Sequence, residues 1–154
     1  MKLYLLRHGE AKSKDEDPEQ ALTDNGQAAV LRVASFAQGA GVSAARIVHS
    51  GKRRARQTAE IIAGLLKPTP ALSASDGLDP MDEPGIWMSR LDEEKQPIML
   101  VGHLPYMGRL ASVLLCGNSE KETITFTAGS MLCLHRSTEG AWTVQWMITP
   151  AMLR

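Results

Sequence analysis

The sequence has only two cysteines, Cys116 and Cys133, which are too few for a disulfide-bonded scaffold. We expect both to be small buried hydrophobic residues of a protein from a reducing compartment. No stretch approaches the roughly 20 consecutive apolar residues of a membrane span, and the apolar run Leu3–Leu6 is far too short for a signal peptide. These absences predict a soluble, cytoplasmic protein without a membrane partner.

The sequence also lacks an excess of one charge and has few aromatic residues. The 17 Lys and Arg balance the 17 Asp and Glu, and aromatic residues make up 5% of the chain. Binding to nucleic acids or anionic membranes normally needs a clear basic excess, so the composition argues against both. One local cluster, formed by Lys52, Arg53, Arg54 and Arg56, keeps an RNA-binding module open as an alternative. The zero net charge and the absence of a recognised RNA motif disfavour it.

The length fits one domain. We expect the 154 residues to form a single domain spanning residues 1–154. A domain of this size buries about two-thirds of the surface that its unfolded chain exposes, and a hydrophobic content of 44% supplies the side chains for that core. The densely charged segment Lys12–Gln20 is predicted to be a solvated loop.

Short apolar runs alternate with helical patterns along the chain. Strands are predicted at Leu3–Leu6, Arg46–His49 and Ile98–Val101, and a hairpin with its turn at Glu139–Gly140 is predicted from Met131–His135 and Trp142–Ile148. Apolar residues at helical spacing follow each of the first three strands: Val30, Val33, Ala34 and Ala37; Ala59, Ile62, Ala63 and Leu66; Met107, Leu110, Ala111 and Leu114. This order predicts an α/β fold, a three-layer α/β/α sandwich with a mostly parallel sheet and the C-terminal hairpin at its edge.

Local signals set the expected helix ends. Asp24 is predicted to cap the first helix, and Gly39 and Gly41 to end it. Pro68 is predicted to stop the second helix, and Pro105 to lie in the first turn of the third. The segment between Pro68 and Pro84 is expected to be a loop.

The carboxyl ends of the predicted strands carry cationic or titratable side chains. The first strand runs into Arg7 and His8, the second is followed by Arg54, and the third runs into His103. A lone histidine is more often structural than catalytic, and His49 and His135 are expected to be core or edge residues. Ligands of open α/β sheets bind beyond the carboxyl ends of the strands, so the shared position of these four residues points to one site.

Two arginines and two histidines without a paired carboxylate predict a pocket for an anion. Planar guanidinium groups bind phosphate oxygens in pairs, and N–H groups of the helix expected to open at Leu104 add to the same site. Such a pocket favours the negative charge of a phosphoryl group in transfer. A histidine nitrogen inside it could attack phosphorus and become transiently phosphorylated.

Competing motifs are weaker. Gly39-x-Gly41-x-x-Ala44 matches the dinucleotide fingerprint by letters, but it follows a helix and precedes a strand, the reverse of that motif. Ser50-Gly51-Lys52 lacks the remaining residues of a nucleotide phosphate loop, and no G-x-S-x-G nucleophile elbow is present. A metal site built from His8, Glu10 and His103 is disfavoured because two nearby arginines would repel the cation.

Four blocks of the sequence carry a resemblance. Leu6–Ala11 contains an RHG motif, Leu22-Thr23 is followed by Gly26, Ser50–Ala59 contains the second arginine, and Val101–Pro105 contains the second histidine. In this order they resemble the histidine phosphatase (phosphoglycerate mutase-like) superfamily, and the chain length and the His-Leu-Pro block are most similar to the short SixA-type phosphohistidine phosphatases.

The resemblance implies roles for the site residues. It implies His8 as the nucleophile, attacking as the neutral imidazole, and Arg7, Arg54 and a protonated His103 as the phosphate pocket, with Gly9 and Leu104 also binding phosphate. It implies no cofactor and no metal. The implied substrate is a phosphorylated protein with a phosphohistidine domain or a small phosphorylated molecule.

The sequence departs from the family pattern at two places. Gly51 stands where members commonly have proline, and the general acid of larger members has no clear counterpart, with Asp79, Asp82 and Glu83 as the candidates. Two alternatives to a protein phosphohistidine phosphatase remain. One is a small-molecule phosphomonoesterase of the same superfamily, and the other is a non-catalytic module that binds phosphate or phosphoproteins. A mutase is disfavoured because the chain lacks the length for lid insertions.

Overall fold

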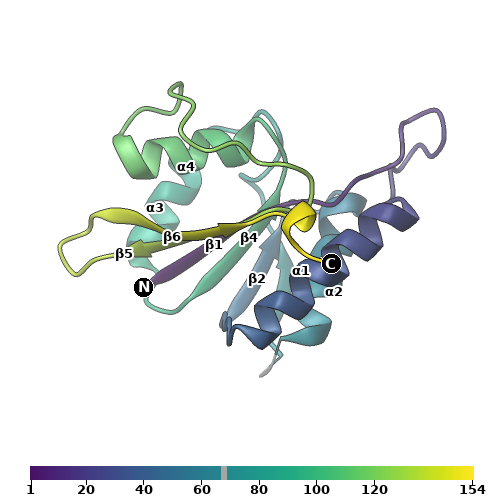
Figure 1. Ribbon diagram of the computed structural model, residues 1–154. Coiled ribbons are helices and arrows are strands. Elements are labelled where there is room, and N and C mark those ends of the chain that lie inside the picture. Colours follow the sequence, from purple (N-terminus) through teal and green to yellow (C-terminus); the bar gives the residue numbers. More distant parts are fainter. Residues whose placement is uncertain (67–68) are drawn as a thin grey trace.

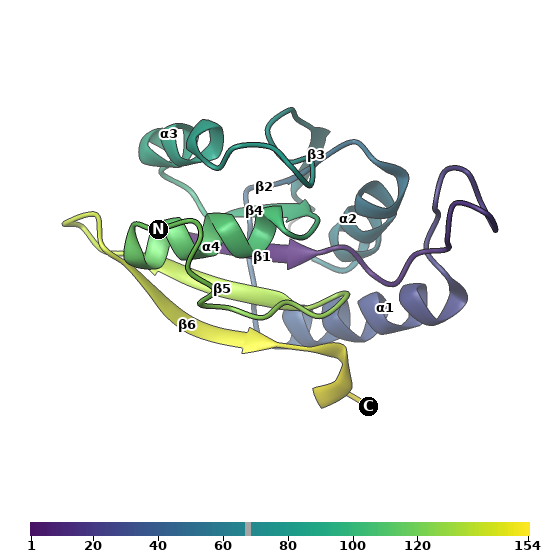
Figure 2. The same cartoon turned by 90° about the horizontal axis from the view of Figure 1, so that it is seen from above.

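The computed structural model describes residues 1–66 and 69–154 and is built on one six-stranded sheet. The strands are β1 (Lys2–Arg7), β2 (Arg46–His49), β3 (Ala71–Ala74), β4 (Ile98–Gly102), β5 (Met131–Arg136) and β6 (Trp142–Ile148). Their order across the sheet is β3-β2-β4-β1-β5-β6, and it runs from the top to the bottom of the view in Figure 2. The first four of these are parallel, whereas β5 and β6 are antiparallel to their neighbours. The predicted, mostly parallel sheet with a C-terminal hairpin at its edge is therefore confirmed.

Helices cover both faces of the sheet. The helices α1 (Asp24–Gly39) and α2 (Arg53–Leu65) lie on one side, and α3 (Gly85–Glu93) and α4 (Tyr106–Cys116) lie on the other (Figure 1). In β1, Tyr4 and Leu6 belong to the core beneath α1 and α2, while Leu3 and Leu5 belong to the core beneath α3 and α4. Alternate side chains of a strand point to opposite faces, so a strand buried on both sides becomes the continuous apolar run seen in the sequence. The three-layer α/β/α sandwich is confirmed.

Two elements were missed in the sequence. The strand β3 lies inside the segment expected to be a loop, and α3 was not predicted at all. All four residues of β3 are exposed, and the strand exists through its parallel pairing with β2 at the sheet edge. Helix α3 buries only Trp87 and Leu91, which gives a weak helical pattern. No helix in the described ranges is long and apolar enough to cross a membrane.

Three predicted helix ends need correction or comment. Thr23, rather than Asp24, caps α1, because its hydroxyl accepts a hydrogen bond from the backbone N–H of Gly26. Pro105 is the residue before the first turn of α4 rather than a member of it. Helix α2 ends at Leu65, and Pro68, which was predicted to stop it, lies outside the described residues.

Candidate active site

The parallel pairing of β1 with β4 brings the two predicted site histidines together. Arg7 lies opposite Gly102 in the register, and the backbone N–H of His8 donates to the carbonyl of Gly102 at 2.9 Å. His8 and His103 therefore leave adjacent strands at the same edge of the sheet, and their ring centroids lie 5.0 Å apart. The juxtaposition follows directly from the sheet order.

Arg54 reaches the same edge from the next strand. The strand β2 pairs with β4 on the side away from β1, and α2 begins four residues after β2 ends. Arg54 lies in the first turn of that helix, and its charge is close enough to lower the pKa of both His8 and His103. The structure thus gathers all four predicted residues, Arg7, His8, Arg54 and His103, around one point.

Arg7 is held by the segment that precedes β5. Its Nη1 donates to the carbonyl of Phe126 at 2.9 Å, and its backbone carbonyl accepts from the N–H of Gly129. Its Nε is buried and has no hydrogen-bond partner among the described residues. A buried N–H without a partner is costly, so this donor is suited to an oxygen of a bound anion.

Thr58 links the segment after His8 to α2. Its hydroxyl accepts from the backbone N–H of Gly9 at 3.0 Å and donates to the carbonyl of Arg54 at 2.8 Å. Gly9 was expected to bind phosphate, but its N–H is taken by Thr58. Space instead demands glycine here, because a Cβ at Gly9 would lie 2.7 Å from a methyl group of Val30.

The backbone fixes the tautomer of His8. Its Nδ1 lies 2.7 Å from the carbonyl oxygen of Gly9, and a carbonyl can only accept, so Nδ1 carries the proton and Nε2 carries the lone pair. Burial, and then the charges of Arg54 and Arg7, lower the pKa of His8 to about 4. At neutral pH the ring is uncharged and its Nε2 is a competent nucleophile.

Only one of the two ring nitrogens of His103 has a hydrogen-bond partner in the described residues. Its Nε2 lies 2.6 Å from the hydroxyl of Ser50, while its buried Nδ1 has no partner among the described residues. Burial, and then the charges of His8 and Arg54, lower the pKa of His103 to about 3. The protonated ring expected from the sequence therefore differs from the neutral ring of the protein alone, and the negative charge of a phosphoryl group is what would raise its pKa.

The candidate general acids are engaged with groups other than the site histidines. Asp79 is half-exposed and lies 3.8 Å from Nζ of Lys52, and its negative charge opposes the burial that lowers the pKa of Arg54. Asp82 accepts from the backbone N–H of Asp79, and the highly exposed Glu83 lies 3.4 Å from Arg109. None of the three carboxylates hydrogen-bonds to the four site residues within the described chain, and Asp79 is the one whose charge acts on them.

The remaining predicted features lie at the margin or elsewhere. Leu104 is adjacent to His103, but α4 opens at Tyr106, two residues later than expected. Buried His49 accepts from the backbone N–H of Gly51, and His135 lies in β5, as expected for core or edge residues. Glu10, offered above as a metal ligand, accepts instead from the hydroxyl of Thr23. In the described residues, no group of three or more His, Cys, Asp or Glu is placed to hold a metal ion.

Comparisons with known proteins identify the family of this chain. Residues 3–97 match the model of the histidine phosphatase superfamily, branch 1. An uncharacterised protein of Picosynechococcus is 35% identical over 77% of this chain and 76% of its own length. Phosphohistidine phosphatase SixA of Escherichia coli is 25% identical over all of this chain and 97% of its own length. The solved structure of the protein histidine phosphatase SixA complexed with tungstate superposes with a TM-score of 0.88, at 26% identity and full coverage of both chains. The chain belongs to branch 1 of the histidine phosphatase superfamily and is a phosphatase.

Proposed function

We propose that this phosphatase hydrolyses phosphohistidine on a protein, through a phosphohistidine intermediate on its own His8. His8 is the nucleophile, Arg7 and Arg54 bind the phosphoryl oxygens, and His103 becomes protonated as the phosphoryl group arrives. The observation that carries the proposal is the uncharged His8, which the carbonyl of Gly9 orients and whose pKa the nearby charges of Arg54 and Arg7 help to lower.

The first step is an in-line attack on phosphorus. Nε2 of His8 forms a bond to phosphorus while the bond from phosphorus to the substrate imidazole breaks, and the substrate nitrogen keeps that electron pair. Arg7 and Arg54 stabilise the negative charge on the phosphoryl oxygens during transfer. Water then attacks the phosphorus on His8, the bond to Nε2 breaks, and phosphate leaves with the water oxygen.

The leaving group favours phosphohistidine over alkyl phosphates. An alkoxide is a strong base and needs a proton donor, whereas an imidazole has a pKa near ~6.5 and its ring can already hold the required proton. The three candidate carboxylates make no hydrogen bond to the histidines or arginines of the site, and Asp79 is paired with Lys52. A site of this kind cleaves a P–N bond without a dedicated acid. The similarity over the full chain to a phosphohistidine phosphatase supports the same substrate.

Side-by-side kinetics test the proposal. The kcat/KM values for a phosphohistidine peptide, phosphoserine, a sugar phosphate and nitrophenyl phosphate are compared for the wild type and His8→Ala. We expect the peptide to be hydrolysed fastest, the aryl ester to be intermediate, and His8→Ala to be inactive. Brief incubation should leave acid-labile phosphate on His8, and EDTA should not reduce turnover.

Other outcomes identify the alternatives. A sugar phosphate as the best substrate would make the protein a small-molecule phosphomonoesterase, as would an Asp79→Asn variant that loses activity on alkyl phosphates alone. Binding of tungstate without turnover of any substrate would make it a phosphate-binding module. Substantial activity in His8→Ala would mean that water attacks the substrate directly.

A further inference from the structure

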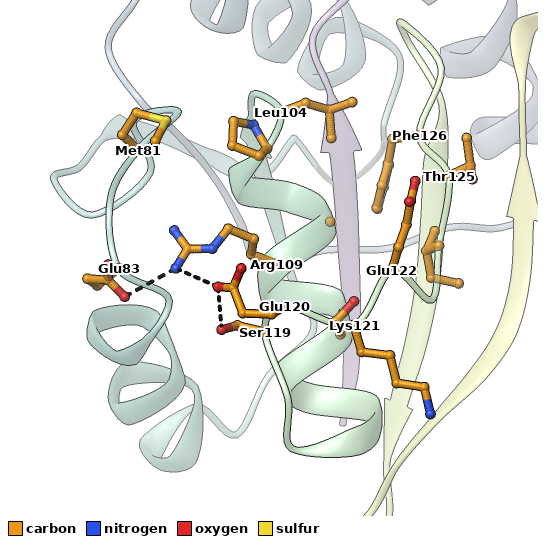
Figure 3. Close-up of a pocket in the computed structure, with 14 residues that line it drawn as sticks. Met81, Glu83, Leu104, Arg109, Ser119, Glu120, Lys121, Glu122, Thr125 and Phe126 are labelled. Atoms are coloured by element: carbon orange, nitrogen blue, oxygen red, sulfur yellow. Dashed lines mark hydrogen bonds and ion pairs between the residues drawn. The ribbon is translucent and has the colours of Figure 1, made fainter.

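A groove of about 870 Å³ lies beside the catalytic residues, on the α4 side of the sheet. It runs between α4, the segment before α3 and the segment that leads from α4 to β5 (Figure 3). Its lining includes Met81, Leu104, Arg109, Glu120, Glu122 and Phe126. Nothing in the phosphoryl-transfer step uses this groove.

The groove borders two of the proposed phosphate-binding residues. Leu104 directly follows His103, and the carbonyl of Phe126 accepts the hydrogen bond from Nη1 of Arg7. A substrate whose phosphoryl group contacts Arg7 and His103 therefore brings its adjoining atoms to the mouth of the groove. The volume is that of a pocket for a whole small ligand, which exceeds one side chain. The groove therefore has room for more of the substrate than its phosphohistidine side chain.

Arg109 joins the two walls of the groove. From α4, its Nη2 lies 3.4 Å from Glu83 on one wall and 3.4 Å from Glu120 on the other (Figure 3). The Arg109 side chain is only 20% exposed, whereas both glutamates are 78% exposed. One guanidinium thus pairs with two carboxylates and fixes the spacing of segments that are remote in the sequence.

The lining has an apolar part and an acidic rim. Met81 is 74% exposed and Leu104 is 36% exposed, so both present apolar surface to solvent at the groove. Glu83, Glu120 and Glu122 outnumber Arg109 and Lys121 on the lining, and no ion pair of Glu122 is formed within the described chain. The fit is to a surface with an apolar side chain and a cationic side chain close together.

We propose that this groove is the docking surface for the protein that carries the phosphohistidine. The partner presents its phosphohistidine on a folded surface, places an apolar side chain against Met81 and Leu104, and places a Lys or Arg opposite Glu122. The inference rests on the proposed function and adds the chemistry by which the partner is chosen. A small phosphate ester without a cationic group, the other body that the groove could hold, would leave Glu122 without an ion pair.

Reversing the charge at one position of the enzyme and at one position of the substrate tests the docking surface. The probes are two versions of one folded helical protein, phosphorylated on a single exposed histidine with phosphoramidate, with Leu and either Lys or Glu one helical turn from that histidine. Wild type should have the higher kcat/KM for the Lys version, and Glu122→Lys should reverse this preference. The matched control, Glu139→Lys in the exposed β5–β6 turn, should keep it.

The apolar part has its own pair of variants. Met81→Asp should lower kcat/KM for the phosphorylated protein about tenfold, the scale of a contact residue at an interface, and leave nitrophenyl phosphate within twofold. Met152→Asp changes a similarly exposed methionine, at 66%, outside the groove and should alter neither.

Each outcome decides between the claims. A charge preference that does not depend on residue 122, or equal losses of Met81→Asp on both substrates, overturns the docking surface and leaves the proposed function standing. If Met81→Asp loses activity toward a small apolar phosphate ester and keeps its activity toward the phosphorylated protein, the groove is a subsite for small molecules. Failure of the wild type to hydrolyse any phosphohistidine, with nitrophenyl phosphate still cleaved, refutes the proposed function and the docking surface together.

Discussion

Replacement of Thr58 by valine removes one hydroxyl and leaves the outline of the side chain nearly unchanged. Thr58 is fully buried, and its hydroxyl is the link between the backbone N–H of Gly9 and the carbonyl of Arg54. Valine leaves the buried N–H of Gly9 without a partner. Such an unsatisfied donor costs about 1–3 kcal/mol of the free energy of unfolding. In a chain of this size, each kcal/mol lowers the Tm by about 2–4 °C.

The assay separates the hydrogen bonds from packing. Urea and thermal unfolding are compared for the wild type, Thr58→Val and Thr58→Ser, and kcat is measured with nitrophenyl phosphate. Serine keeps the hydroxyl, so we expect it to keep most of the kcat that valine loses, even if the missing methyl costs some stability. Wild-type stability and kcat in Thr58→Val would show that the link does not hold His8 and Arg54 in place, and the reasoning would be wrong.

Three further predictions follow from the surroundings of the histidines. Ser50→Ala removes the 2.6 Å contact that orients His103, so kcat should fall about tenfold while KM changes little, in steady-state kinetics. Because the pKa of His8 is about 4 and that of His103 about 3, the unfolded state binds more protons below the ordinary value of ~6.5. The free energy of unfolding should therefore fall as the pH is lowered from about 6.5 to 4, measured by urea unfolding. Tungstate binding at pH 7 should take up protons, seen by calorimetry in buffers of different ionisation enthalpy, and His103→Gln should reduce that uptake.

The layers of the fold could be predicted because the central strands have a clear pattern in the sequence. In β1 and β4, side chains are buried on both faces, so the sequence shows unbroken apolar runs of strand length. The edge strand β3 has four exposed residues and no such run. Its existence depends on pairing with β2, a partner more than 20 residues earlier in the chain, which local pattern does not report.

The four candidate site residues could be found for a similar reason, since each lies at or shortly after the end of a strand that the sequence predicts. The residues that hold them in place could not. Thr58 bonds to Gly9 across 49 positions, and Ser50 meets His103 across 53. Both read as ordinary helix or loop residues in the sequence, and their roles exist only once the sheet has brought the segments together. The resemblance to the family pattern included both within a matching block without giving either a role.

In the proposed mechanism, Arg7 and Arg54 act on His8 as well as on the phosphoryl group. After burial, their charges are what disfavour protonation of His8, so the groups that bind the substrate anion also keep the Nε2 lone pair free before the anion arrives. The same charges act on His103, whose pKa is lower still. When a phosphoryl group enters, its negative charge offsets the arginines, and the ring with the uncommitted Nδ1 is able to gain a proton, while Nδ1 of His8 is already engaged with the carbonyl of Gly9. In the proposed mechanism, two histidines in one electrostatic field can thus take different roles, His8 as the nucleophile and His103 as a cation that stabilises the phosphoryl group, because their hydrogen bonds differ.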